Sequence, residues 1–201
     1  MEKENKKYKL TNITKKYNGI TLYQIRALRN IINPWNEFEL IARKGELGGW
    51  VERENNLSQY GECWVGEDAI VMRGAKIQDM AQVSGSSIIT EEAIIRGCAQ
   101  VWGHTTVRGE AIVQDRAGVG SIFPIIIGGS AVISGNAWIN DSAPIKITGG
   151  EFFCTIPFPP KEERGKRKKE RKRIIMKIRD EKYLPSECTI SYCPKVEKLI
   201  T

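Results

Sequence analysis

Residues 63–119 divide into hexads that share one pattern: CWVGED, AIVMRG, AKIQDM, AQVSGS, SIITEE, AIIRGC, AQVWGH, TTVRGE, AIVQDR and AGV. The third position of each hexad is Val or Ile, and the first is Cys, Ala, Ser or Thr. A period of six matches neither the 3.6-residue repeat of a helix nor a simple hairpin meander. It is typical of a triangular parallel β-helix, in which three flat sides close one coil and the coils stack in register. We therefore expect the aliphatic and small residues to point inward.

The ladder of aliphatic residues continues from Ile127 to Ile145, so the repeat body is assigned to residues 57–150, or four to five coils. The step from Val119 to Ile127 is eight residues instead of six, which predicts a two-residue bulge at a corner near Pro124. Gly or Asp recurs two positions after the aliphatic residue and marks the corners, because these residues tolerate a positive φ or bond their own backbone. The expected corner residues are Asp79, Gly85, Gly97, Gly103, Gly109, Asp115, Gly129, Gly135 and Asp141.

Residues 1–56 do not repeat and are expected to form an N-terminal cap. Lys7–Leu10 and Thr21–Ala27 have the composition of strands, and Asn18-Gly19 is a turn signal before the second. Three glycines within residues 45–51 predict a tight corner that leads onto the first coil. An open β-helix end exposes unpaired backbone groups and apolar interior, so a cover is physically required.

Residues 151–201 are expected to be a linker and a small basic C-terminal element. The proline-rich residues 156–160 are stiff, and a run of basic residues follows them. This run could contact phosphates nonspecifically, or it could be a solvated linker. It contains no aromatic residue on which bases could stack, which argues against sequence-specific RNA binding. The basic residues are Lys166, Arg167, Lys168, Lys169, Arg171, Lys172 and Arg173.

The net charge of +7 is unevenly distributed along the chain. Residues 1–50 carry ten Lys and Arg against five Asp and Glu, residues 51–150 seven against eleven, and residues 151–201 fourteen against eight. An acidic repeat body thus lies between two basic ends. No apolar run approaches the roughly 18 residues of a membrane span, and the charged N-terminal residues argue against a secretory signal. Five cysteines without framework spacing favour a reduced, cytoplasmic protein.

Motifs in the cap carry a resemblance to a known family. They are Tyr8-Lys9-Leu10-Thr11, the segment from Thr21 to Leu28, the segment from Gly45 to Val51, and Asn56-Leu57-Ser58-Gln59. Followed by hexads, these motifs resemble bacterial and phage hexapeptide-repeat proteins that have a small N-terminal cap and a left-handed parallel β-helix. The resemblance covers about residues 7–147 and implies the left hand, which the period alone does not. Members are often labelled acyltransferases because trimeric acyltransferases share the fold, but the basic segment after residue 160 differs from the family's usual ending.

Catalytic signals are sparse. Acyltransferases of this fold use a histidine base in a cleft between subunits, and the chain has one histidine, His104, which is expected to point outward from a corner. A solvated or partner-facing histidine is the competing interpretation. Zinc enzymes of the same fold need three histidines, so we predict no metal site and no cofactor.

Apolar residues recur at outward positions of the repeat. Eighteen-residue stacking places Ile70 beside Ile88 and Ile94 beside Ile112, and Trp138 also points outward. Contiguous apolar residues outside a core are typical of protein interfaces. The partner is expected to be a second copy, giving a dimer or trimer, or a foreign protein.

These features predict an all-β protein: a left-handed parallel β-helix with an N-terminal cap and a basic C-terminal extension. The leading functional hypothesis is a non-enzymatic scaffold of phage or prophage origin that binds a host protein, for example in a defence complex. One alternative is an acyltransferase that uses His104. Another is nucleic-acid binding by the basic C-terminal segment.

Overall fold

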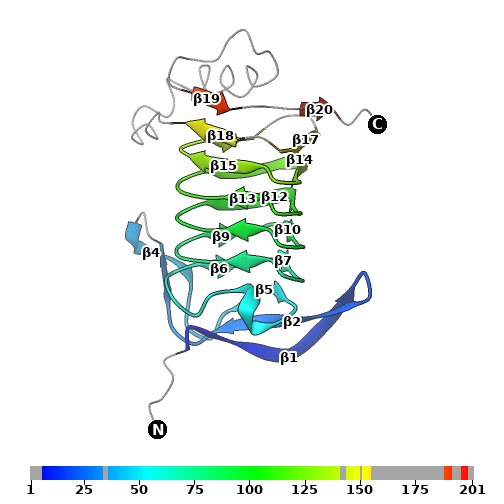
Figure 1. Ribbon diagram of the computed structural model, residues 1–201. Helices are drawn as coiled ribbons and strands as arrows, with labels where there is room; N and C mark the ends of the chain where they lie inside the picture. Colours follow the sequence, from blue (N-terminus) through cyan, green and yellow to red (C-terminus); the bar gives the residue numbers. More distant parts are fainter. Residues whose placement is uncertain are drawn as a thin grey trace.

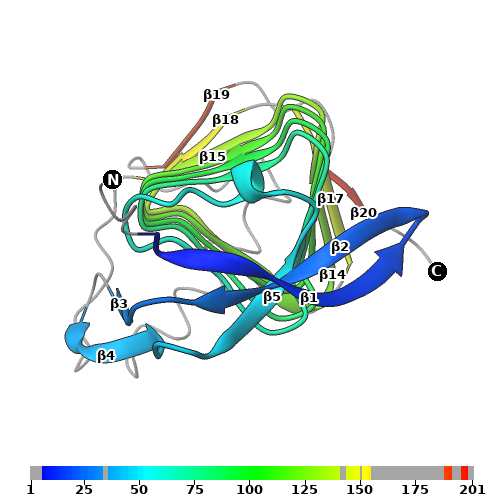
Figure 2. The ribbon, with the colours of Figure 1, turned by 90° about the horizontal axis from the view of Figure 1, so that it is seen from below.

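The computed structural model describes residues 6–33, 36–140, 144–149, 151–154, 188–191 and 196–198. The regular structure of these residues is β-strand apart from one short 3₁₀ helix, η1 (Glu54–Asn56). The strands form a left-handed parallel β-helix of about five coils, and Figure 2 shows its three-sided outline. The predicted fold class is therefore confirmed. No helix in the described part of the chain is long and apolar enough to cross a membrane.

Each side of the triangle is a ladder of parallel strands. Face 1 contains β5 (Leu47–Val51), β7 (Ile70–Val71), β10 (Ile88–Ile89), the second halves of β12 (Gln100–Val107) and β14 (Gly118–Gly128), and β17 (Ile145–Thr148). Face 2 contains β8 (Lys76–Ile77), β11 (Ile94–Ile95), β13 (Ile112–Val113), β15 (Val132–Gly135) and β18 (Glu151–Cys154). Face 3 contains β6 (Trp64–Val65), β9 (Gln82–Val83), the first halves of β12 and β14, and β16 (Trp138–Ile139).

The core lies inside the triangle and has the predicted register. Ile70 pairs with Ile88, and Ile94 pairs with Ile112, so neighbouring coils are offset by 18 residues. The small inward residues, such as Ala99, are fully buried, as are most of the aliphatic residues two positions later. Such tight stacking leaves no room for a larger residue at the small position.

The predicted corner residues that lie in the described part of the chain all have positive φ, between 58° and 71°. Asp141 lies outside the described residues. Acidic side chains also link successive corners: a carboxylate oxygen of Asp79 accepts a hydrogen bond from the Gly97 N–H at 2.9 Å, and Asp115 accepts one from Gly135 at 2.9 Å. These bonds explain part of the acidic character of the repeat body, because a charged acceptor strengthens a hydrogen bond to a backbone N–H.

The predicted two-residue insertion lies where face 3 turns into face 1. Gly103 pairs with Ser121, but Thr105 pairs with Ile125, so the offset between coils changes from 18 to 20 residues opposite His104. Strand β14 remains continuous through this bulge and does not break at Pro124. The bulge carries Ile122, which is 81% exposed.

The cap consists of β1 (Tyr8–Tyr17), β2 (Ile20–Ala27), β3 (Ile31–Asn33) and β4 (Asn36–Ala42). Strands β1 and β2 form an antiparallel hairpin with positive φ at Asn18 and Gly19, as predicted, and β3 and β4 form a second hairpin. Figure 1 shows the first hairpin beneath the coils and β4 beside β6 and β9. Strand β2 pairs with β5, which in turn pairs in parallel with β7, so the cap and face 1 share one sheet.

At the other end, the last parallel strands are covered by antiparallel ones. Strand β19 (Cys188–Ser191) pairs with β18, and β20 (Val196–Lys198) pairs with β17. The upper edges of faces 1 and 2 are therefore paired, which reduces the exposed edge that promotes aggregation.

Candidate functional site

Side chains from the cap donate hydrogen bonds to backbone carbonyls of the first coil, which has no further coil below it. Lys7 and Tyr8 are both 0% exposed. The Lys7 Nζ donates to the carbonyl of Cys63 at 2.8 Å and lies 3.4 Å from the carbonyl of Tyr60. The Tyr8 hydroxyl lies 2.5 Å from the carbonyl of Glu54 and 2.8 Å from that of Leu57. These contacts satisfy backbone carbonyls that would otherwise be buried without partners.

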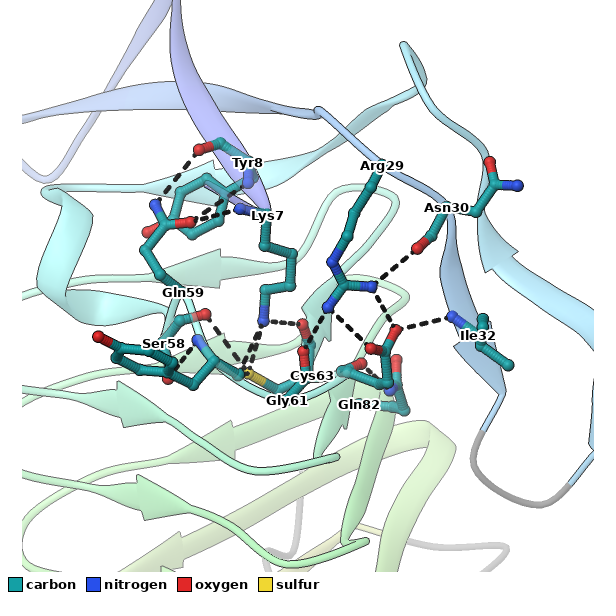
Figure 3. Close-up of polar contacts among 12 residues, drawn as sticks. Lys7, Tyr8, Arg29, Asn30, Ile32, Ser58, Gln59, Gly61, Cys63 and Gln82 are labelled. Atoms are coloured by element: carbon teal, nitrogen blue, oxygen red, sulfur yellow. Dashed lines mark hydrogen bonds and ion pairs between the residues drawn. The ribbon is translucent and has the colours of Figure 1, made fainter. Parts of the chain in front are cut away.

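The motif from Asn56 to Gln59, which carried the family resemblance, has the same structural role. The Asn56 side-chain N–H donates to the carbonyls of Arg73 at 3.0 Å and Ala75 at 2.9 Å. The Gln59 side-chain oxygen accepts from the Lys7 backbone N–H at 2.9 Å, as Figure 3 shows. The motif therefore joins the cap to the coils.

A second group of contacts holds the β3–β4 hairpin beside face 3. The Glu62 carboxylate pairs with the Arg29 guanidinium at 2.7 Å and accepts from the backbone N–H of Ile32 at 2.9 Å. Burial alone would raise the pKa of Glu62, but the bonds from Arg29 and Ile32 outweigh it, so the pKa is lowered. The Gln82 amide donates to the backbone carbonyl of Glu62 at 2.9 Å and ties this group to face 3.

An open groove with a volume of about 450 Å³ lies between the β3–β4 hairpin and face 3. This volume suits a small ligand or a short extended peptide segment. The cap wall consists of Asn33, Ile41, Glu46 and Leu47. The main side chains of the coil wall are Trp64, Gln82, Ser84, Gln100 and Trp102.

Glycines on face 3 set the positions of the tryptophan rings. A Cβ at Gly120 would collide with the Trp102 ring, and one at Gly118 would collide with the Trp138 ring. The two rings are 4.7 Å apart between centroids and tilted by 41°. Trp102 is thus held against the coil by packing, which limits the freedom it would lose on binding a partner.

The polar groups of the groove are amides and carboxylates. Among the described residues that line it, Glu46 and Glu67 are the charged ones, and none is Lys, Arg or His. The Gln100 side chain makes no hydrogen bond among the described residues, so its amide is available to a ligand. The groove is therefore suited to a neutral or basic ligand with hydrogen-bonding groups, and it disfavours phosphates.

The structure corrects one predicted surface residue. Ile70 was expected to face solvent, but it is only 6% exposed, because the β1–β2 hairpin covers it. Leu22 from the hairpin packs with Ile70 and Met72, and Ile88 lies half-buried at the edge of this cluster. The cap thus uses the lower end of face 1 as its own packing surface.

The other predicted interface residues lie on the outside of the coils. Ile94 and Ile112 are half-buried neighbours on face 2, followed by Val132 in the next coil. Trp138 is half-buried on face 3 against Trp102. No contact tests whether any of them binds a partner, so the interface assignment stays a prediction.

His104 is exposed at the corner opposite the bulge, as predicted. Among the described residues it makes no hydrogen bond or ion pair, so nothing orients it as a general base. The described residues also contain no cluster of three His, Cys, Asp or Glu side chains that could hold a metal ion. The basic run from Lys166 to Arg173 lies outside the described residues, and its role stays a prediction.

The chain has the architecture of a hexapeptide-repeat β-helix protein: its sequence repeats every six residues, its aliphatic residues point into the core, and its strands form three parallel faces. Over 66 residues it is 38% identical to YdcK of Escherichia coli K12, which is named an uncharacterized acetyltransferase. The match covers 32% of this chain, which spans about a fifth of the length of YdcK. No protein-family model matches the sequence.

Sequence reasoning missed the groove. Trp64 occupies an outward position of the repeat but is only 3% exposed, and the β3–β4 hairpin that forms the groove beside it has no repeat and no motif. The available signal was a difference in residue type: the outward positions of face 3 carry Trp64, Gln82 and Gln100, where those of the other faces carry mainly Ile and Val.

Proposed function

We propose that this protein binds another protein and that the groove receives an extended segment of that partner. The observation that carries the proposal is the half-buried Trp102 beside Gln82 and Gln100 in a groove of about 450 Å³ built on a rigid ladder, with Trp64, which is 3% exposed, buried in the groove wall. Tryptophans are enriched among the residues that dominate protein-binding energy. A β-helix presents such residues without the ordering cost of a flexible loop.

The amides of the groove favour a peptide over a purely apolar ligand. Gln100 has an unpaired donor and acceptor, which match the N–H and carbonyl groups of a peptide backbone. The carboxylates of Glu46 and Glu67 favour a segment that is neutral or basic. By the same argument, the phosphates of nucleic acid or of an acyl-thioester donor bind poorly here.

The partner that we propose is a host protein, and the protein acts on it without catalysis. Support comes from the resemblance to phage and bacterial repeat proteins, and from His104, which no carboxylate among the described residues orients. A component of a nucleic-acid-targeting defence complex is the kind of partner that this proposal includes.

Affinity capture from a lysate of the bacterial host tests the proposal. Wild-type protein should retain a specific host protein, and a Trp102→Ala, Gln100→Ala double variant should retain at least tenfold less of it. A variant on face 2, Lys76→Ala, changes an exposed side chain outside the groove; it is the matched control and should retain the same amount as wild type. If wild type retains no host protein, or if the groove variant retains it fully, the proposal is wrong.

A second candidate function is acyl transfer, which the similarity to YdcK favours. In that case His104 would act as the general base, and the exposed corner beside the bulge would be completed by another subunit. The test is consumption of acetyl-coenzyme A in the presence of amine and hydroxyl acceptors, comparing wild type with His104→Ala. Turnover that is lost in a folded His104→Ala variant would establish the enzyme function instead.

A further inference from the structure

A buried amine and a buried thiol lie in direct contact at the junction of cap and coils. Lys7 and Cys63 are both 0% exposed, and the Lys7 Nζ lies 3.1 Å from the Cys63 Sγ. Figure 3 shows the lysine side chain reaching down from the cap to the sulfur. The hydrogen-bond acceptors of this Nζ are the Cys63 sulfur and two backbone carbonyls, and no carboxylate is among them.

These surroundings favour the uncharged form of both groups. Burial lowers the pKa of Lys7, although Cys63 opposes this shift, so a larger share of the side chain is neutral amine than in water. Burial also raises the pKa of the Cys63 thiol, which Lys7 opposes. A neutral amine has a free lone pair and can act as a nucleophile, whereas an ammonium cannot.

We propose that Lys7 and Cys63 form an oxidative cross-link in which one oxygen atom bridges the Nζ and the Sγ. The oxidant is molecular oxygen, which is small and apolar enough to enter a packed interior. One N–H bond, the S–H bond and the O–O bond break, and an N–O bond, an O–S bond and two O–H bonds form. One oxygen atom becomes the bridge and the other leaves as water, so O₂ accepts four electrons from the amine and thiol.

The geometry selects an oxygen bridge over a direct bond. The 3.1 Å separation is that of a hydrogen bond and is only somewhat longer than the N···S span of a bent N–O–S bridge, whereas a direct N–S bond would require a much larger approach. The bridge therefore forms with little movement of β1 or of the first coil. It joins residues 56 positions apart, so it fixes the cap to the coils as a disulfide would.

Intact-protein and peptide mass spectrometry after purification in air, with and without dithiothreitol, tests the cross-link. The expected product links the peptide of Lys7 to the peptide of Cys63, with a gain of one oxygen and a loss of two hydrogens, and reductant reverses it. Cys98 is an internal control, because its thiol contacts Met80 and no lysine. Oxygen gained on Cys63 alone, a linked pair without the oxygen, or no change at Cys63 while Cys98 oxidises would overturn the proposal.

Variants provide a second measurement. Lys7→Arg has a side chain of similar length but no neutral amine, so the linked peptide should disappear and the melting temperature should become independent of dithiothreitol. Wild type should melt several degrees lower after reduction, because the cross-link restricts the unfolded chain. A wild-type melting temperature that reductant does not change, in protein that carries the linked peptide, contradicts the stabilising role.

Discussion

At the N-terminal end of the β-helix, Lys7 and Tyr8 donate hydrogen bonds to the backbone carbonyls of the first coil, as the N–H groups of a neighbouring coil do elsewhere. Every other coil has its carbonyls paired by the N–H groups of a neighbour, for example Ala99 with Gln82 at 2.9 Å. At the first coil, the Lys7 amino group and the Tyr8 hydroxyl supply donors instead. The cap is therefore bound to the coils by directional bonds as well as by apolar packing.

The small inward residues give the sharpest test of the repeat at the scale of a residue. Ala99 is 0% exposed between two coils, and Ala99→Leu should lower the free energy of unfolding by about 1–3 kcal/mol through overpacking. Denaturant unfolding measures the change. Gln78→Leu on the outside of face 2 is the control and should stay within about 0.5 kcal/mol of wild type. An unchanged Ala99→Leu variant would contradict the assigned register.

Acid should weaken the group that holds the β3–β4 hairpin. Because the pKa of Glu62 is lowered in the folded protein, its stabilising contribution is present above its ordinary pKa of 4.5 and is lost as the pH falls below that value. Wild type should therefore lose stability relative to Glu62→Gln between pH 5 and pH 3. Melting temperatures across this range measure it, and parallel pH profiles for the two proteins would refute the role of Glu62.

At the scale of elements, the β1–β2 hairpin uses the lower part of face 1 as its packing surface. Ile70→Glu would place an unpaired charge under Leu22 and should destabilise the protein by about 3 kcal/mol or more. The matched variant Ile94→Glu changes a half-buried position on face 2 and should cost less than about 1 kcal/mol in the monomer. Denaturant midpoints compare the two, and equal midpoints would mean that the hairpin does not cover Ile70 in solution.

The sequence predicts the coils much better than it predicts the cap. A hexad repeats the same physical requirement at each coil, so Val65 and its equivalents reveal face, register and corner together. The hairpins occur once, and their positions depend on single contacts such as Arg29 with Glu62, which has no periodic signal. For the same reason, the burial of Ile70 and the groove over Trp64 could not be read from the repeat.

At the scale of the whole molecule, face 2 is the surface that the cap leaves uncovered. We propose that Ile94, Ile112 and Val132 mediate self-association, because a contiguous apolar strip is typical of subunit interfaces. An Ile94→Glu, Ile112→Glu double variant should then sediment as a monomer under conditions in which wild type forms a dimer or trimer. If wild type is already monomeric at the same concentrations, the strip is ordinary surface.

The most direct test of the proposed function is photo-cross-linking from single positions on the two surfaces. A photoreactive residue in place of Gln100 lies in the groove, and one in place of Gln78 lies outside it on face 2. In host lysate, position 100 should cross-link to one host protein through a single neutral or basic segment, and position 78 should not. Cross-linking of that host protein at position 78 and not at position 100 would contradict the assignment of the groove as the binding site.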